Sequence, residues 1–224
     1  MNVQEATTRR LPDLKGRYLP ENCRETINTI LKETYGYEQF RNLEIYDDLS
    51  KGKEKLCISQ GQLIENVILE VEKAWKGETQ VDNILLTAPT GPGKSLLFQL
   101  PAIYLGKEYN LLTIVVSPLK ALIVDQVESL QELGYTRVAY ASSDLSPEQK
   151  MEVYRQVREG EIDLFYLSPE LLLSYDIKHF VGERRIGLVP VDPCDRRSAG
   201  CRYPRLDPGG GRVPAGCGLP DAAG

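Results

Sequence analysis

The chain has 224 residues, of which 42% are hydrophobic and 26% charged, and its formal net charge at pH 7 is -5. This composition is typical of a globular protein that buries a sizeable core, as one large domain or two small ones. No apolar run approaches the ~20 residues of a membrane span, and the N-terminus lacks the apolar segment of a secretory signal. We therefore expect no membrane partner and a cytoplasmic location. Mild acidity leaves nucleic acid open as a partner, because a binder needs basic residues only along one groove.

The cysteines do not indicate a metal site. The sequence has five cysteines and a single histidine, His179, and no two cysteines form a C-x-x-C pair. Zinc sites usually combine such pairs with further cysteines or histidines. We therefore expect free thiols in a reducing compartment.

Residues 1–60 form a mixed, charged segment of helix and loop. Helical spacing of apolar residues occurs over 26–35, and the polar stretch 47–55 is expected to be a loop. A second helix is predicted over 62–75 and is ended by Lys76-Gly77. Its apolar face is formed by four residues, Leu63, Val67, Ile68 and Val71.

From residue 83 onward, short apolar strands alternate with helices. Strands are predicted over 84–87, 111–116, 136–141, 162–167 and 186–191. Helices are predicted over 95–105 and 119–133, from Ser146 onward, and over most of 170–180. Ser146 and Gln149 can form a capping box around Pro147 at the start of one of these helices. The alternation implies right-handed crossovers, and so an α/β fold with a parallel sheet flanked by helices, RecA-like in its order, over residues 61–192.

A phosphate-binding loop is the clearest functional motif. The pattern Ala88-x-x-x-x-Gly93-Lys94-Ser95 follows a predicted strand and opens a predicted helix, as a P-loop does. Lys94 would neutralise the β- and γ-phosphates of a nucleotide, and the Ser95 hydroxyl would hold Mg²⁺. The helix N-terminus adds partial positive charge. The alternative is a Gly/Pro-rich turn that merely precedes a helix.

The interior of this loop contains one unusual residue. Thr90 and Gly91 are small and would let backbone amides wrap a polyphosphate. Pro92 has no N–H to offer. Pro92 lowers the affinity of the loop for phosphate if its backbone nitrogen faces the phosphate. Pro92 only stiffens the turn if its backbone nitrogen faces away.

Several stretches resemble the first motor lobe of superfamily 2 DEAD/DEAH-type helicases, and most closely the RecQ-like DNA helicases. The P-loop is similar to motif I of that superfamily. Further matches occur in the same order as in the family, over roughly 35–192: Tyr35-Gly36-Tyr37-Glu38-Gln39-Phe40-Arg41, Gly61-Gln62-Leu63-Ile64-Glu65, Val116-Ser117-Pro118-Leu119-Lys120-Ala121-Leu122 with Asp125-Gln126, Ser142-Ser143-Asp144-Leu145-Ser146, and Tyr166-Leu167-Ser168-Pro169-Glu170.

The resemblance implies roles for individual residues. Gln62 would recognise adenine, Tyr37 would stack on the base and Arg41 would add a contact, although about twenty residues between Arg41 and Gln62 must loop out. Ser117, Lys120 and Ser168 would contact the backbone of single-stranded DNA without reading its sequence. The alternatives are a solvated helix residue for Gln62, a capped helix with an exposed lysine for Ser117 and Lys120, and a strand-to-helix turn for Ser168.

The chain departs from the family at the motif that normally ends in Asp-Glu-x-His. Asp192 is in register for the carboxylate that holds Mg²⁺ through water, but Pro193 replaces the catalytic glutamate. Pro190 also interrupts what should be a central strand. Residues 193–224 are rich in Gly, Pro, Ala and Arg and show no amphipathic period, which predicts a disordered tail. We consider two explanations for the composition of this tail: an out-of-frame reading of the gene that begins near residues 189–193, and a genuine disordered tail.

The sequence thus predicts the ATP-binding lobe of a RecQ-like DNA helicase that binds ATP, Mg²⁺ and nucleic acid. Of the catalytic residues of the family, Lys94 and Asp192 would be present. The chain is expected to have no room for the second motor lobe that hydrolysis and unwinding require. Two alternatives stay open: a non-catalytic nucleotide-binding or regulatory module, and a different P-loop NTPase. The oligomeric state is not indicated.

Overall fold

The computed structural model describes residues 23–46, 55–78, 84 and 93–191. All of them belong to one compact unit, Met1–Pro193, and the second unit, Cys194–Gly224, contains none of them. The predicted strand at 84–87 and the predicted tail at 193–224 therefore lie outside the described residues, apart from Ile84.

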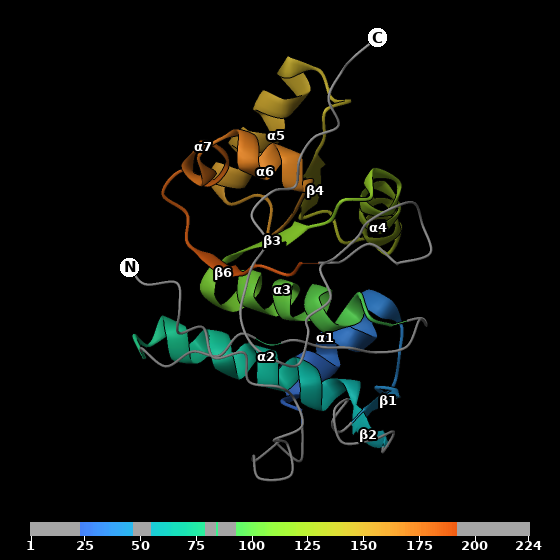
Figure 1. The fold of residues 1–224 in the computed structure, drawn as a ribbon. Coiled ribbons are helices and arrows are strands. Elements are labelled where there is room, and N and C mark those ends of the chain that lie inside the picture. Colours follow the sequence, from blue (N-terminus) through green and yellow to red (C-terminus); the bar gives the residue numbers. More distant parts are fainter. Residues whose placement is uncertain (1–22, 47–54, 79–83, 85–92, 192–224) are drawn as a thin grey trace, which may run out of the picture. The chain divides into compact units, whose positions relative to one another are not determined.

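A parallel sheet of four strands forms the centre of the described fold (Figure 1). The strands are β3 (Leu112–Val116), β4 (Val138–Ala141), β5 (Leu164–Leu167) and β6 (Ile186–Leu188), in the order β4-β5-β3-β6. Every adjacent pair is parallel. All five residues of β3 and all four of β5 are buried, as expected for strands covered on both faces. The predicted parallel α/β sheet is confirmed.

Two layers of helices cover the sheet because side chains alternate across it. Leu164 and Tyr166 of β5 join the core with α1 (Glu25–Tyr35), α2 (Gln60–Trp75), α3 (Leu96–Tyr109) and α4 (Lys120–Glu132). Phe165 and Leu167 join the opposite core with α5 (Pro147–Glu159), α6 (Pro169–Ser174) and α7 (Ile177–Val181). The chain moves one way along the sheet from β3 to β4 and back from β4 to β5. Right-handed crossovers therefore put α4 and α5 on opposite faces.

A β-hairpin stands between the first two helices, where the sequence predicted only a loop. Strands β1 (Asn42–Tyr46) and β2 (Lys55–Ser59) are antiparallel, with Asn42 opposite Ser59. The predicted loop at 47–55 lies outside the described residues except for Lys55, which belongs to β2. The hairpin places the residue before β1 next to the residue after β2, so Arg41 meets the start of α2.

Two further differences concern the end of the fold. The stretch predicted as one helix over 170–180 is divided into α6 and α7, because Asp176 caps α7 through a hydrogen bond from the Lys178 amide. Strand β6 ends at Leu188, but the Val116 amide still donates to the carbonyl of Pro190, 2.9 Å away, and a single bridge joins Val116 to Val191. Pro190 thus interrupts the strand, as predicted, while its carbonyl stays in the ladder.

The predicted capping box of α5 is confirmed. The Ser146 hydroxyl accepts from the Gln149 amide, the Gln149 side chain accepts from the Ser146 amide, and Pro147 occupies the first turn. Among the described helices, none is both long and apolar enough to cross a membrane.

Candidate nucleotide and nucleic-acid site

The described end of the phosphate loop runs directly into α3. Ser95 is the N-cap of this 14-residue helix, and Lys94 precedes it with an exposed side chain. The Ser95 side chain makes no capping hydrogen bond, so its hydroxyl is not committed to the helix. The carbonyls of Lys94 and Ser95 accept from Leu97, Phe98 and Gln99, which fixes the first turn. An ammonium group, a hydroxyl and a helix N-terminus thus meet at one point, as polyphosphate binding requires.

Gln60 holds this loop from the side. Its Nε2 donates to the carbonyl of Gly93 at 3.0 Å, and its Oε1 accepts from the Arg41 amide at 3.1 Å. The Gln60 backbone amide also donates to the Arg41 carbonyl at 2.9 Å. Gln60 is only 2% exposed, so both polar ends of its side chain are satisfied within the protein. Gln60 was not predicted from the sequence, where the family resemblance indicates Gln62, two positions on.

Two glycines beside the Gln60 contact allow close approach. Gly93 has a φ of +106°, and a Cβ there would lie 2.5 Å from Gln60 Nε2. A Cβ at Gly61 would lie 2.7 Å from Cδ2 of Phe40, so the ring of Phe40 packs directly on the first turn of α2. The two glycines allow the aromatic segment, α2 and the phosphate loop to approach closely.

The side predicted to contact the base consists of aromatic and guanidinium groups. Tyr37 is 49% exposed and stacks on Tyr35, with ring centroids 6.4 Å apart and planes at 14°. The Arg41 guanidinium carbon lies 5.8 Å from the centre of the Tyr37 ring, within cation–π range. The structure therefore brings Tyr37 and Arg41 together, beside the Gln60 contact to the loop.

Gln62 is used locally at the start of α2. Its Oε1 accepts from the Ser59 amide at 3.2 Å as part of a capping box. Its Nε2 takes no part in that box. Pairing with adenine needs one acceptor and one donor, and Oε1 keeps a second lone pair for the acceptor role.

Three serines follow the carboxyl ends of three adjacent strands. Val116, Ala141 and Leu167 are in register across β3, β4 and β5, so Ser117, Ser142 and Ser168 line up one residue further on. All three side chains are buried: Ser117 is 3%, Ser142 5% and Ser168 6% exposed. Ser168 caps α6 by accepting from the Leu171 amide, and Ser142 accepts from the Asp144 amide. The Ser117 hydroxyl is buried without a hydrogen-bond partner.

Of the three residues predicted to touch nucleic acid, Lys120 alone presents an exposed side chain. Its ammonium forms an ion pair with Asp144 at 2.9 Å and a hydrogen bond with the Ser143 hydroxyl. This contact lowers the pKa of the Asp144 carboxyl below its usual range, chiefly through the hydrogen bond from Lys120. The pair joins the loop after β3 to the loop after β4 on the surface next to the serines.

Six residues that the sequence singled out lie outside the described residues: Ala88, Thr90, Gly91, Pro92, Asp192 and Pro193. Their predicted roles toward phosphate and Mg²⁺ stay predictions. Within the part of the chain that the structure describes, no group of three or more His, Cys, Asp or Glu side chains could hold a metal ion. Ser95 stays a predicted Mg²⁺ ligand, which would act beside a bound polyphosphate.

Comparison with known proteins places this chain in a family. Residues 65–204, more than half of the chain, match the DEAD/DEAH box helicase family. The chain therefore belongs to the DEAD/DEAH box helicases, and the relatives that it matches include RecQ-type DNA helicases.

Three of these relatives come from distant organisms. An ATP-dependent DNA helicase RecQ of Synechocystis sp. is 32% identical over an alignment that includes 75% of this chain and 28% of the relative. The ATP-dependent DNA helicase Q-like 5 of Arabidopsis thaliana is 31% identical over an alignment that includes 75% of this chain and 15% of the relative. A RecQ of Bacillus subtilis is 36% identical over 49% of the chain and 18% of its own length. The chain thus spans less than a third of the length of these relatives.

One solved structure shows a weak overall similarity to this chain. A chain described as a DUF1998 helicase MrfA bound to DNA covers 73% of this chain and 18% of its own length, with 20% identity and a TM-score of 0.42.

Proposed function

We propose that this lobe binds ATP at the start of α3. The observation that carries the proposal is the junction at Ser95, where an exposed lysine and an uncommitted hydroxyl stand at the N-terminus of a long helix. Lys94 would neutralise the β- and γ-phosphates, and Ser95 with Asp192 would hold Mg²⁺. Thr90, Gly91 and Gly93 would wrap the phosphates with backbone amides. Bound Mg²⁺ would screen the phosphate charge.

On the base side, we propose that Tyr37, Arg41 and Gln62 contact adenine. Tyr37 offers an exposed ring and Arg41 stands against it, so a base can stack on the outer face of the pair. Gln62 would accept from the adenine N6 amino group and donate to N7, a pattern that guanine does not offer. Gln60 would act as a positioning residue, because it fixes the carbonyl of Gly93 while it holds the Arg41 backbone.

The test of nucleotide binding is a titration with a fluorescent ATP analogue, with and without Mg²⁺. Lys94→Ala should weaken binding by about a hundredfold, because a charge-assisted contact to phosphate is lost. Lys107→Ala is the matched control, since it removes an exposed lysine from the opposite end of α3. Equal affinity of the two variants would overturn the proposal.

We propose that nucleic acid, single-stranded DNA by family resemblance, passes over the loops that follow β3, β4 and β5. Lys120 is an exposed cation at this edge and would meet a backbone phosphate. The hydroxyls of Ser117 and Ser168 are buried in this arrangement, so contact of either hydroxyl with a phosphate would require a local rearrangement. Support comes from the names of the relatives, which are DNA helicases.

We further propose that the chain binds ATP without turning it over. Pro193 stands where the family has the glutamate that activates water, and proline has no titratable group. A phosphate-release assay with single-stranded DNA compares the wild type with Lys94→Ala. We expect both to stay at background. Turnover that is present in the wild type and absent in the variant would contradict the proposal and leave ATP binding intact.

A further inference from the structure

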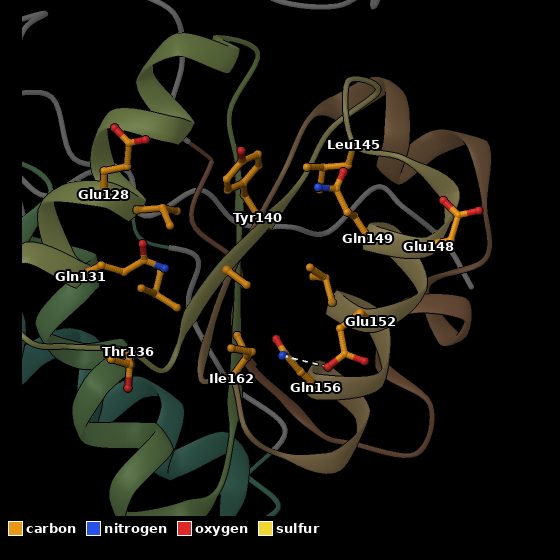
Figure 2. A pocket seen from close by; sticks show the side chains of 14 residues that line it. Glu128, Gln131, Thr136, Tyr140, Leu145, Glu148, Gln149, Glu152, Gln156 and Ile162 are labelled. Atoms are coloured by element: carbon orange, nitrogen blue, oxygen red, sulfur yellow. Dashed lines mark hydrogen bonds between the residues drawn. The ribbon is translucent and has the colours of Figure 1, made fainter.

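A groove of about 720 Å³ opens along β4, the edge strand at the opposite end of the sheet from β6. Figure 2 shows its two walls: Glu128 and Gln131 come from α4 on one side, and Gln149, Glu152 and Gln156 from α5 on the other. Its floor contains Val138, Ala139 and Tyr140 of β4, and Thr136, Leu145 and Ile162 are among the other lining residues. The groove is therefore an open slot along one strand, bounded by two helices.

The floor strand offers unpaired backbone groups. Strand β4 pairs with β5 on one side, and no described residue pairs with it on the other, because it stands at the end of the sheet order. In an edge strand, the outward N–H and C=O groups are a template for another strand. Side chains of α4 and α5 line the two sides of this edge. An incoming chain would thus be extended and flanked on both faces.

The lining selects the charge of what enters. Three of the lining residues are glutamates, namely Glu128, Glu148 and Glu152, and none of the fourteen is a lysine, arginine or histidine. Hydrogen bonds from Arg155 lower the pKa of Glu152, and one from Ser146 lowers the pKa of Glu148, so both carboxylates are ionised at neutral pH. Arg155 does not line the groove and is shared among Glu152, Glu159 and Glu161, so a single positive charge faces three carboxylates beside this wall.

We propose that this groove docks an extended, basic segment of a partner protein, which adds a strand to β4 and places lysine or arginine side chains against Glu128 and Glu152. Strand addition supplies affinity through main-chain hydrogen bonds, and the acidic walls supply selectivity for charge. A nucleic acid is disfavoured here, because its phosphates would face carboxylates. The site is separate from the phosphate loop and does not depend on the proposed ATP binding.

The probe is a fluorescein-labelled peptide, Lys-Lys-Val-Val-Lys-Lys-Val-Val, in which both faces of the extended chain present lysines. Its binding to the full chain is measured by fluorescence anisotropy at low salt. A peptide with proline in place of valine keeps the charge but removes strand donors and should bind at least about tenfold more weakly. A peptide with glutamate in place of lysine should not bind. Failure of the lysine–valine peptide to bind, or equal binding of the proline peptide, would overturn the proposal.

A pair of double variants locates the binding. Glu128→Gln with Glu152→Gln should weaken peptide binding by about fivefold or more, because two wall charges are lost. Glu132→Gln with Glu159→Gln is the matched control: it removes the same charge from the same two helices and also one partner of Arg155, but neither residue lines the groove. Its affinity should stay within about twofold of the wild type. Equal losses of affinity in both double variants would overturn the proposal. Sedimentation would also overturn it if it showed that the chain self-associates and that the self-associated form does not bind the peptide.

Discussion

The side chain of Gln60 spans the gap between Gly93 in the phosphate loop and Arg41 in the aromatic segment. One amide supplies both contacts, a donor 3.0 Å from the Gly93 carbonyl and an acceptor 3.1 Å from the Arg41 amide. Each half of the amide can satisfy one partner, so a carboxylate or an alkyl chain of the same length could not replace it. The phosphate side and the base side of the proposed ATP site are therefore fixed relative to one another by a single buried residue.

Gln60→Ala should weaken binding of ATP and GTP analogues alike, by about tenfold, because it loosens the loop that holds the phosphates. Gln62→Ala should instead reduce the preference for ATP over GTP and, through loss of half a capping box, cost about 1 kcal/mol of stability. Titration of both variants with both nucleotides separates the two effects. A selective loss of ATP binding in Gln60→Ala would show that Gln60, not Gln62, contacts the base.

The sequence was sufficient for the central α/β architecture because the apolar periods there are strong. The buried strands β3 and β5 and the amphipathic stripe of α4 are local patterns, and the capping box at Ser146 is a local hydrogen-bond motif. Each is decided by residues close together in the chain. Their parallel arrangement follows from the helical connections.

The Gln60 contact could not be predicted in the same way because it depends on tertiary structure. The alternation in Asn42–Tyr46 and Lys55–Ser59 was a signal for the hairpin, but its register decides that Arg41 meets Gln60 rather than Gln62. Burial of Ser117 and Ser168 is likewise a consequence of packing at the sheet edge. A motif indicates which loop contributes to a site, while the fold decides which of its side chains are accessible.

Asp163 should be far more important for stability than an exposed carboxylate. It is fully buried and accepts hydrogen bonds from Tyr135 at 3.1 Å, from Arg137 at 2.6 and 2.8 Å and from Arg184 at 3.0 Å. Asp163→Ala leaves the Arg184 side chain, only 5% exposed, without its counter-charge, so we expect a loss of about 3–5 kcal/mol in urea unfolding. Asp144→Ala, which breaks the exposed pair with Lys120, should leave the unfolding midpoint unchanged. Equal midpoints for the two variants would contradict this assignment.

The two described cysteines should differ in their reactivity with pH. Burial, reinforced by the charge of Glu65, raises the pKa of the Cys23 thiol to about 12, whereas Cys57 is exposed. A raised thiol pKa disfavours the reactive thiolate, so iodoacetamide at pH 8.5 should label Cys23 at least about tenfold more slowly than Cys57 in the folded chain. The difference should vanish in concentrated urea. Peptide mapping by mass spectrometry measures both rates, and rapid labelling of Cys23 in the folded chain would refute the burial argument.

Lys120 and Asp144 should have opposite effects on nucleic-acid binding. Lys120→Ala removes an exposed cation from the proposed DNA edge, so it should weaken binding to a fluorescent oligo(dT) and reduce the salt slope by about 0.7. Asp144→Asn frees the Lys120 ammonium from its 2.9 Å ion pair and removes a carboxylate that repels phosphate, so it should strengthen binding. Lys107→Ala, which removes the same charge from the far end of α3, is the control and should match the wild type. Because a general loss of charge would affect both lysine variants equally, only the combined pattern of one loss, one gain and one unchanged affinity supports a phosphate contact at Lys120.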